Sequence, residues 1–387
     1  MHKKLRFILL IPIMLFAAGC GSSTPEATPT PTRTPIPEVV MLPTITPTAT
    51  SIPEVQAQAA TPFPPDVNPL TGLKVADPTL LEHSPLAIKV SNSPEVRPQS
   101  GLNSADLVFE HFAEGGITRF TAVFYGTMPE RVGSVRSGRL IDLEIPAMYQ
   151  GTFSFSGASA GVKDRMRASD LFPNQLIAPD FGVGEPYFYR VPREGLAFEH
   201  TLFADPETLH TLAAERGVDH RPDYPQMMHF SESMPAGQVA TDVTYFEVNY
   251  LPSVCTAEWR YDAEQAVWKR SIAGEAHTDY LTGEQLAFSN VVIVYANHIE
   301  TDILEDTWGG GHMSIEIQIW GSNSALVLRD GKMLQGHWKR EARGDMLTFW
   351  DGAGNPLPLK PGNTWFQMVP LDTGSEEIQT GQFRFTP

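Results

Sequence analysis

The chain has 387 residues, of which 42% are hydrophobic and 10% aromatic, a composition that supports globular cores and favours two domains. Lys and Arg total 28 against 45 Asp and Glu, giving a formal net charge of -17. A surface this acidic repels nucleic acid and anionic lipid headgroups, so nucleic acid is not expected as a partner.

The first twenty residues predict export. A cationic start, MHKKLRF, is followed by the short apolar run ILLIPIMLFAA and by AAGC. The run is too short for a comfortable membrane span and is typical of a signal peptide, here residues 1–19. Its end resembles a bacterial lipobox, although Ala17 stands where that motif usually has Leu. The resemblance implies that Cys20 is acylated and anchors the chain to a lipid bilayer; the alternative is an ordinary secretory signal.

A segment rich in proline and threonine follows, which we assign to residues 20–66. Half of the residues between Thr24 and Pro65 are Pro or Thr. Such a composition buries too little apolar surface to offset chain entropy, so we expect a disordered, extended tether. Its reach suits a protein that works in the cell envelope, outside the cytoplasm.

Residues 67–230 are predicted to form a mixed α/β N-terminal domain. PLAIKVSN reads as a strand, and ADLVFEHFAEGGITRFTAVFYG reads as two strands joined at a Gly-Gly pair. SAGVKDRMRAS is expected to form a helix capped by Ser159, and ADPETLHTLAAERG a helix capped by Asp205 and ended by Gly217. Because strands alternate with helices, we expect a layered α/β structure here.

Residues 240–387 are predicted to form a mostly antiparallel β domain. Segments such as VTYFEVNY, NVVIVYANH and SALVLRDGKMLQGHWKR alternate strand-forming residues with turn residues. All 7 tryptophans lie in this part of the chain. We interpret them as core residues first, and as sugar-stacking platforms second.

The stretch RVGSVRSGRL, residues 131–140, is the leading candidate site. If a helix begins near Gly138, then Arg136 and Arg139 flank its N-terminus, where free N–H groups and the helix dipole favour an anion. Planar guanidiniums give bidentate contacts to phosphate or carboxylate. Ser137 lies between them, and Arg119 on the preceding strand is a third candidate cation.

Two further interpretations stay open. In the first, the arginines pair with nearby carboxylates and only fix the fold; the candidates are Asp106, Glu110, Glu114, Asp142 and Glu144. In the second, the site is enzymatic, with Glu110 or Asp142 as base or metal ligand and His200 assisting. The chain has no GxxxxGK[ST] or HExxH motif, so neither a metal nor another cofactor is expected.

Several long motifs resemble the YerB-like bacterial lipoprotein family, a two-part domain of unknown function. They are SNSPEVRPQSGLNSADLVFEHFAEGGITRFTAVFYG, ERVGSVRSGRLIDLE, GASAG, EHTLF, NVVIVYANH, RDGKMLQGHWKR and LKPGNTWFQMVP. The resemblance implies an α/β N-terminal module, a β-rich C-terminal module and no established chemistry. Arg136 and Arg139 match a recurrent pair of that family, and His200 matches its histidine. Ser134 and Gly138 depart from it, since the family usually has Pro and Ala there.

Together these features favour a membrane-anchored binding or scaffold lipoprotein of the cell envelope. Its ligand would be an anion or glycan held at the Arg136/Arg139 loop, and its partners a cell-wall polymer or envelope proteins. The alternative is an envelope enzyme that acts on a phosphorylated or glycan substrate. In outline, the Arg-bearing turn between strands is also similar to the LytR-CpsA-Psr phosphotransferases.

Overall fold

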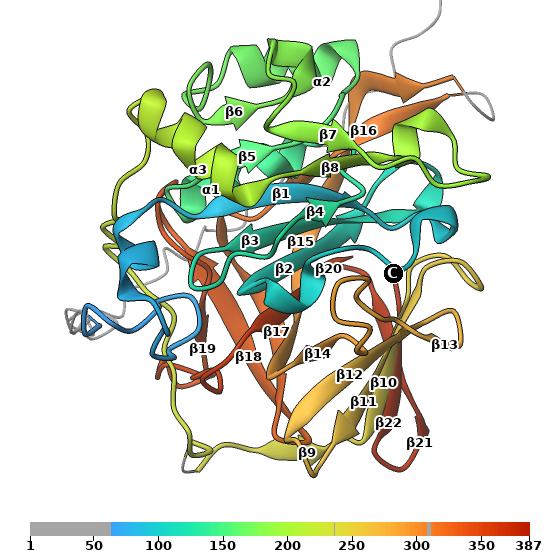
Figure 1. The fold of residues 1–387 in the computed structure, drawn as a ribbon. Coiled ribbons are helices and arrows are strands. Elements are labelled where there is room, and N and C mark those ends of the chain that lie inside the picture. Colours follow the sequence, from blue (N-terminus) through green and yellow to red (C-terminus); the bar gives the residue numbers. More distant parts are fainter. Residues whose placement is uncertain (1–62, 236, 308–310) are drawn as a thin grey trace, which may run out of the picture. The chain divides into compact units, whose positions relative to one another are not determined.

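The computed structural model describes residues 63–235, 237–307 and 311–387, which all belong to one compact unit (Figure 1). The expected signal peptide, Cys20 and nearly all of the expected tether lie outside the described residues. Within the described ranges, no helix is long and apolar enough to cross a membrane.

The protein is mostly β, and one mixed sheet of twelve strands forms its centre. Ten of the strands follow one another across this sheet: β19 (Thr348–Trp350), β18 (Lys332–Arg340), β17 (Gly321–Arg329), β15 (Asn290–Asp306), β20 (Thr364–Pro370), β2 (Leu107–Phe112), β3 (Thr118–Phe124), β1 (Leu86–Ser91), β5 (Thr152–Ser154) and β6 (Leu176–Ile177). Two more strands join it from the side, β16 (His312–Gln318) on β15 and β9 (Ala240–Asp242) on β18.

The central sheet runs through both of the modules expected from the sequence. β20 lies between β15 and β2 and is parallel to both, with Leu107 opposite Thr364 and Phe109 opposite Phe366. Backbone hydrogen bonds therefore join the N-terminal part of the chain to the C-terminal part. The boundaries 67–230 and 240–387 remain a prediction about the sequence, but their strands share one sheet.

Two smaller sheets complete the fold. A sheet of seven strands consists of β13 (Glu275–Ala276), β12 (Val267–Ile272), β11 (Thr256–Asp262), β10 (Tyr245–Asn249), β22 (Gln382–Thr386) and β21 (Gly374–Gln379), with β14 (Ala287–Phe288) beside β12. A sheet of three strands consists of β4 (Val132–Gly133), β8 (Leu202–Ala204) and β7 (Phe188–Arg190). The β-rich character expected of the C-terminal part is confirmed.

The central sheet is covered on both faces, which explains why β1 is buried along its whole length. One face packs against α1 (Ile145–Met148) and α2 (Ala160–Arg167). The other face packs against the seven-stranded sheet and α3 (Pro206–Glu215). Trp259, Trp268, Trp338 and Trp365 are buried in these two cores, so for them the interpretation as core residues is confirmed.

The N-terminal part carries some helix, but strands dominate it as well. The two expected caps are present: the Ser159 side chain accepts a hydrogen bond from Val162 N at the start of α2, and Asp205 accepts one from Thr208 N at the start of α3. The helix expected near Gly138 is only a 3₁₀ helix, Leu140–Leu143, followed by the single turn of α1. The expected layering of helices and strands is therefore present only in part.

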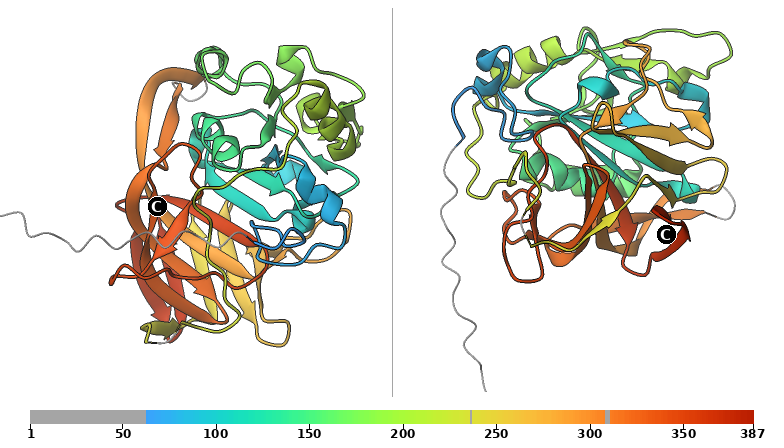
Figure 2. Two further views of the ribbon diagram at one scale, coloured as in Figure 1. Left: turned by 90° about the vertical axis from the view of Figure 1, so that its left-hand side faces the viewer. Right: turned by 90° about the horizontal axis from the view of Figure 1, so that it is seen from below.

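The strand β15 continues beyond the sheet as one arm of a hairpin. Its residues 290–296 pair with β20, whereas its residues 297–306 pair with β16. Figure 2 shows this hairpin, in orange, reaching the green segment that contains α2. Contact is close at Gly161, where a Cβ atom would lie 2.6 Å from Ile303 Cγ2. The hairpin thereby brings residues of the C-terminal part to the arginine loop.

Candidate functional site

The arginine loop is held between strands of two different sheets. Ser134 O accepts a hydrogen bond from Ser91 N at 2.9 Å, and Arg136 N donates one to Lys89 O at 3.1 Å on the same side of β1. Val135 N donates to Leu202 O of β8 at 2.8 Å. These bonds fix the backbone of the loop, so each arginine projects in a defined direction and meets its own surroundings.

Arg131 lies against aromatic rings. Its guanidinium carbon is 5.3 Å from the ring centre of Phe203 and 5.3 Å from that of Tyr280. Such cation–π contacts stabilise a folded loop, and they give Arg131 surroundings of its own.

Arg139 and Arg119 share one carboxylate. Arg139 forms an ion pair with Glu114, and Arg119 Nη2 lies 3.3 Å from Glu114 Oε2. Glu305, on the hairpin, has Oε2 at 3.9 Å from Arg139 Nη1. The side chain of Arg139 is 8% exposed and that of Arg119 14%. The sequence left open whether the arginines pair with nearby carboxylates. Arg119 and Arg139 do so in the structure, and Glu114 is their main partner.

Arg136 differs from its neighbours because its guanidinium has no carboxylate partner among the described residues. Its one hydrogen bond there is Nη1 to Glu199 O, at 3.5 Å, and its buried Nε has no partner. Burial lowers the pKa of Arg136, and the nearby charge of Arg119 lowers it further. A bound anion would offset both effects, so Arg136 is the arginine best suited to a ligand.

His200 is brought next to Arg136. Its carbonyl accepts a hydrogen bond from Ser134 Oγ at 2.7 Å, and its buried Nδ1 has no partner among the described residues. Burial, followed by the charge of Arg136, lowers the pKa of His200, which is therefore neutral at pH 7. A neutral imidazole next to a guanidinium can share a hydrogen bond with a ligand oxygen.

Ser137 and Arg119 border the same region. Ser137 is half-buried, and its carbonyl accepts a hydrogen bond from Arg119 Nη1 at 3.1 Å. The five residues that the sequence grouped as a ligand site thus come close together. In the described part of the chain Arg136, Arg139 and His200 each have a buried nitrogen without a hydrogen bond, but Arg139 pairs with Glu114, whereas Arg136 and His200 have no carboxylate partner. The candidate site is smaller than the predicted one.

The helix N-terminus does not serve as an anion site in this protein. The 3₁₀ helix has only four residues, and the backbone N–H of Arg139 donates to Asp142 Oδ2 at 2.6 Å. A side chain of the protein itself therefore occupies the position that a bound anion was expected to take. The expectation that a helix N-terminus and its dipole would hold an anion here is therefore wrong. A ligand site at this loop must depend on Arg136.

Asp142 belongs to a buried network that the sequence analysis missed. It accepts hydrogen bonds from Lys89 Nζ, with 2.8 Å to its Oδ2, and from Thr121 Oγ1 at 2.6 Å. Lys89 Nζ also contacts His111 Nε2. Burial lowers the pKa of Lys89 to about 7, against the opposing effect of Asp142. The only sequence signal for this network was a lysine inside the apolar strand LAIKVS.

Lys89 is expected to make the protein more stable as the pH rises. The pKa of its ammonium is about 7 in the folded protein, against an ordinary value of 10.5. Between these values the unfolded chain holds a proton that the folded protein has released, so the free energy of unfolding increases by up to about 1.4 kcal/mol per pH unit. Below pH 7 both states are protonated and this increase is absent.

Chemical denaturation of wild type and Lys89→Met between pH 6 and 9 measures this contribution. We expect the wild type to gain stability relative to Lys89→Met above pH 7. Parallel curves for the two proteins would contradict it.

Glu110 lies away from the arginines. It accepts hydrogen bonds from Arg270 Nη2, 3.0 Å from its Oε2, and from Trp365 Nε1 at 3.1 Å. Side chains alternate along β2, so Glu110 faces the core beneath the seven-stranded sheet, whereas its neighbours Phe109 and His111 face the opposite side. The structure therefore separates Glu110 from the site for which it was a candidate acid or base.

Metal ligands do not gather in the described part of the chain. No group of three or more His, Cys, Asp or Glu side chains there has a geometry that could hold an ion. Asp142, the other candidate base or metal ligand, has both oxygens engaged by Lys89, Thr121 and Arg139. What this region offers a ligand is one guanidinium and one imidazole.

Comparisons with known proteins match nearly the whole described chain to one family. Residues 70–219 match the family described as "Protein of unknown function (DUF3048) N-terminal domain", and residues 246–366 match its C-terminal domain. A Bacillus subtilis (strain 168) protein named "Putative lipoprotein YerB" is 30% identical over 316 residues, which is 81% of this chain and 89% of that protein. The crystal structure of YerB from Bacillus subtilis is similar, with a TM-score of 0.64 and 29% identity, over 79% of this chain and 97% of that one. The resemblance seen in the sequence motifs is confirmed.

Proposed function

Because the chain belongs to the DUF3048 family, we propose that it is an exported lipoprotein, anchored through acylated Cys20, that binds an anionic polymer of the cell envelope at Arg136 and His200. Its lipoprotein character is supported by the lipobox-like AAGC and by the printed name of its YerB relative. Ser137 and Arg119 border the binding site, and Arg139 supports it by fixing Glu114.

The proposal depends on one observation, which is that neighbouring arginines differ in whether they have a carboxylate partner. Arg119 and Arg139 have Glu114 as a partner, whereas Arg136 is half-buried with no carboxylate within 4.0 Å among the described residues. Glu199 and Glu95 act on Arg136 only through longer-range attraction. A guanidinium that is partly removed from water and has no direct ion pair is stabilised by an external anion. Arg136 Nε and His200 Nδ1 have no hydrogen-bond partner in the described part of the chain but are themselves buried, so we assign the contact with a phosphate or carboxylate oxygen to the Nη atoms of Arg136.

The acidity of the chain argues against binding of an anionic polymer over a large surface. With a formal net charge of -17, the surface as a whole repels a polyanion. Attraction is therefore local, and a polymer is expected to bind through one or a few anionic groups at Arg136. Binding fits the site better than catalysis, because Glu110 faces the opposite side of the central sheet and Asp142 is engaged by its neighbours.

Retention on purified envelope polymers tests the proposal. Full-length chain would be applied to an immobilised wall polymer with phosphodiester links and to a neutral wall glycan. We expect wild type to be retained on the first and Arg136→Ala to be lost from it. Arg139→Ala should be retained as far as it stays folded, because its ion pair with Glu114 serves the fold. Equal retention of Arg136→Ala and wild type would refute the site.

A further inference from the structure

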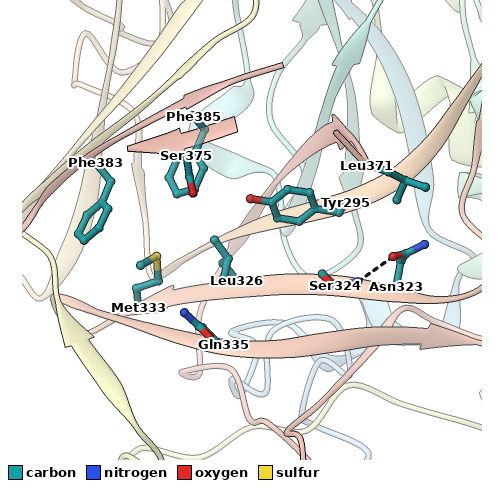
Figure 3. A pocket seen from close by; sticks show the side chains of 10 residues that line it. All are labelled: Tyr295, Asn323, Ser324, Leu326, Met333, Gln335, Leu371, Ser375, Phe383 and Phe385. Carbon is teal, nitrogen blue, oxygen red and sulfur yellow. Dashed lines mark hydrogen bonds between the residues drawn. The ribbon is translucent and has the colours of Figure 1, made fainter. Parts of the chain in front are cut away.

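A hollow of about 420 Å³ opens between the central sheet and the seven-stranded sheet. Strands β15, β17 and β18 form one wall, and β21 and β22 form the other (Figure 3). Its volume lies in the range of roughly 300–1,000 Å³ that is usual for small-molecule sites. The lining residues are Tyr295, Asn323, Ser324, Leu326, Met333, Gln335, Leu371, Ser375, Phe383 and Phe385.

The chemistry of this groove is amphipathic and uncharged. Its apolar part includes the rings of Tyr295, Phe383 and Phe385. None of the ten lining side chains carries a charge. Within the described part of the chain, the hydroxyls of Ser324 and Ser375 and the amide of Gln335 have no hydrogen-bond partner, although all three are exposed at the groove. These groups are free to bind a ligand.

Gln335 also borders a second hollow of about 280 Å³. Its other lining residues are Gly237, Gln238, Val239, Thr241, Asp351, Gly352 and Ala353. Asp351, the one charged member, already accepts hydrogen bonds from Ala353 N at 2.9 Å and from Asn355 Nδ2 at 3.0 Å. Because Gln335 lines both hollows, a linear ligand can extend from one into the other across β18.

We propose that this groove binds a neutral saccharide chain built of N-acetylated amino sugars. An aromatic ring offers a flat apolar face to the C–H face of a sugar ring. The acetamido group combines an apolar methyl with an amide, which matches the apolar floor and the amide of Gln335. An anion finds no positive charge among the ten lining residues, and a wholly apolar ligand would leave the amides and hydroxyls unpaired.

The groove and the arginine site are independent. They share no residue. The groove lies on the face of the central sheet that packs against the seven-stranded sheet, whereas Lys89 and Asp142 lie on the face that packs against α1 and α2. A saccharide could therefore bind here whether or not an anionic polymer binds at Arg136. A protein with both sites would hold two chemically different components of an envelope at once.

Titration calorimetry of the full-length protein with an N-acetylglucosamine tetramer tests the groove. We expect saturable binding to wild type, a loss of about three- to tenfold in affinity for Gln335→Ala, and a larger loss for Ser375→Trp, whose ring would occupy part of the hollow. Gln379→Ala, an exposed change on the same strand β21 but outside the groove, should bind like wild type. Arg136→Ala should also bind the tetramer like wild type, so failure of the arginine site and failure of the groove are distinguishable.

Two results would overturn the proposal. They are an absence of binding to wild type and equal binding by wild type and Ser375→Trp.

Discussion

Glu110→Ala is expected to lower the free energy of unfolding by about 3–5 kcal/mol. The substitution removes the carboxylate that pairs with Arg270 at 3.0 Å, and both side chains are fully buried. It also leaves Trp365 Nε1 and Thr118 Oγ1 without the acceptor they share. An uncompensated buried guanidinium is the main cost, because Arg270 loses its carboxylate partner in a place where its side chain is fully buried.

The same substitution tests whether the two sequence modules fold together. Glu110 belongs to the N-terminal part and Arg270 to the C-terminal part, and β2 and β20 pair beside them. We therefore expect Glu110→Ala to shift one common transition, seen both by tryptophan fluorescence, which reports the C-terminal part, and by hydrogen exchange of β1. Two transitions that separate in the variant would contradict this.

Glu376→Ala is the matched control for Glu110→Ala. Glu376 pairs with Arg384 on the surface at 3.0 Å, with side chains 61% and 39% exposed. Because exposed ion pairs contribute little, this variant should lose less than about 1 kcal/mol.

Asp142→Ala is expected to cost about 3–5 kcal/mol at pH 6, where Lys89 carries its proton. Three donors lose their acceptor at once: Lys89 Nζ, Thr121 Oγ1 and the backbone N–H of Arg139. The last of these caps the 3₁₀ helix, so the arginine loop should loosen as well. Urea denaturation gives the loss in stability, and hydrogen exchange at Arg139 gives the local effect.

Asp142→Asn and Asp164→Ala are the control variants for this prediction. Asparagine keeps an acceptor of the same shape, so it should cost less than alanine. Asp164 forms an exposed pair with Arg167 at 3.2 Å, and its loss should be nearly neutral. A cost below about 1 kcal/mol for Asp142→Ala would show that the buried network contributes little.

The elements that the sequence predicted correctly are those fixed by local chemistry. The strand β1 and the hairpin of β2 and β3 follow from runs of strand-forming residues and a Gly-Gly turn. The starts of α2 and α3 follow from the capping residues Ser159 and Asp205. The pairing of β20 with β2 was not predictable, because alternation marks a strand without naming its partner.

The candidate site was predictable as a group of residues but not in its contacts. The arginines, Ser137 and His200 were found by charge and motif, and the structure brings them close together. Which arginine stays free depends on Glu114 and on Glu305, and Glu305 arrives on a hairpin far along the chain. Lys89 was missed because a lysine in an apolar strand shows its partners only after the sheet has formed.

The affinity for a soluble polymer with phosphodiester links, measured by titration at low salt, tests the proposed function most directly. Wild type, Arg136→Gln and Arg131→Gln are the three proteins to compare, because both variants remove one charge from the same loop. Arg131 lies against aromatic rings and outside the site. We expect Arg136→Gln to bind about tenfold or more weakly than wild type, and Arg131→Gln to bind like wild type as far as it stays folded. Equal affinities for wild type and Arg136→Gln would contradict the proposal that Arg136 holds the ligand.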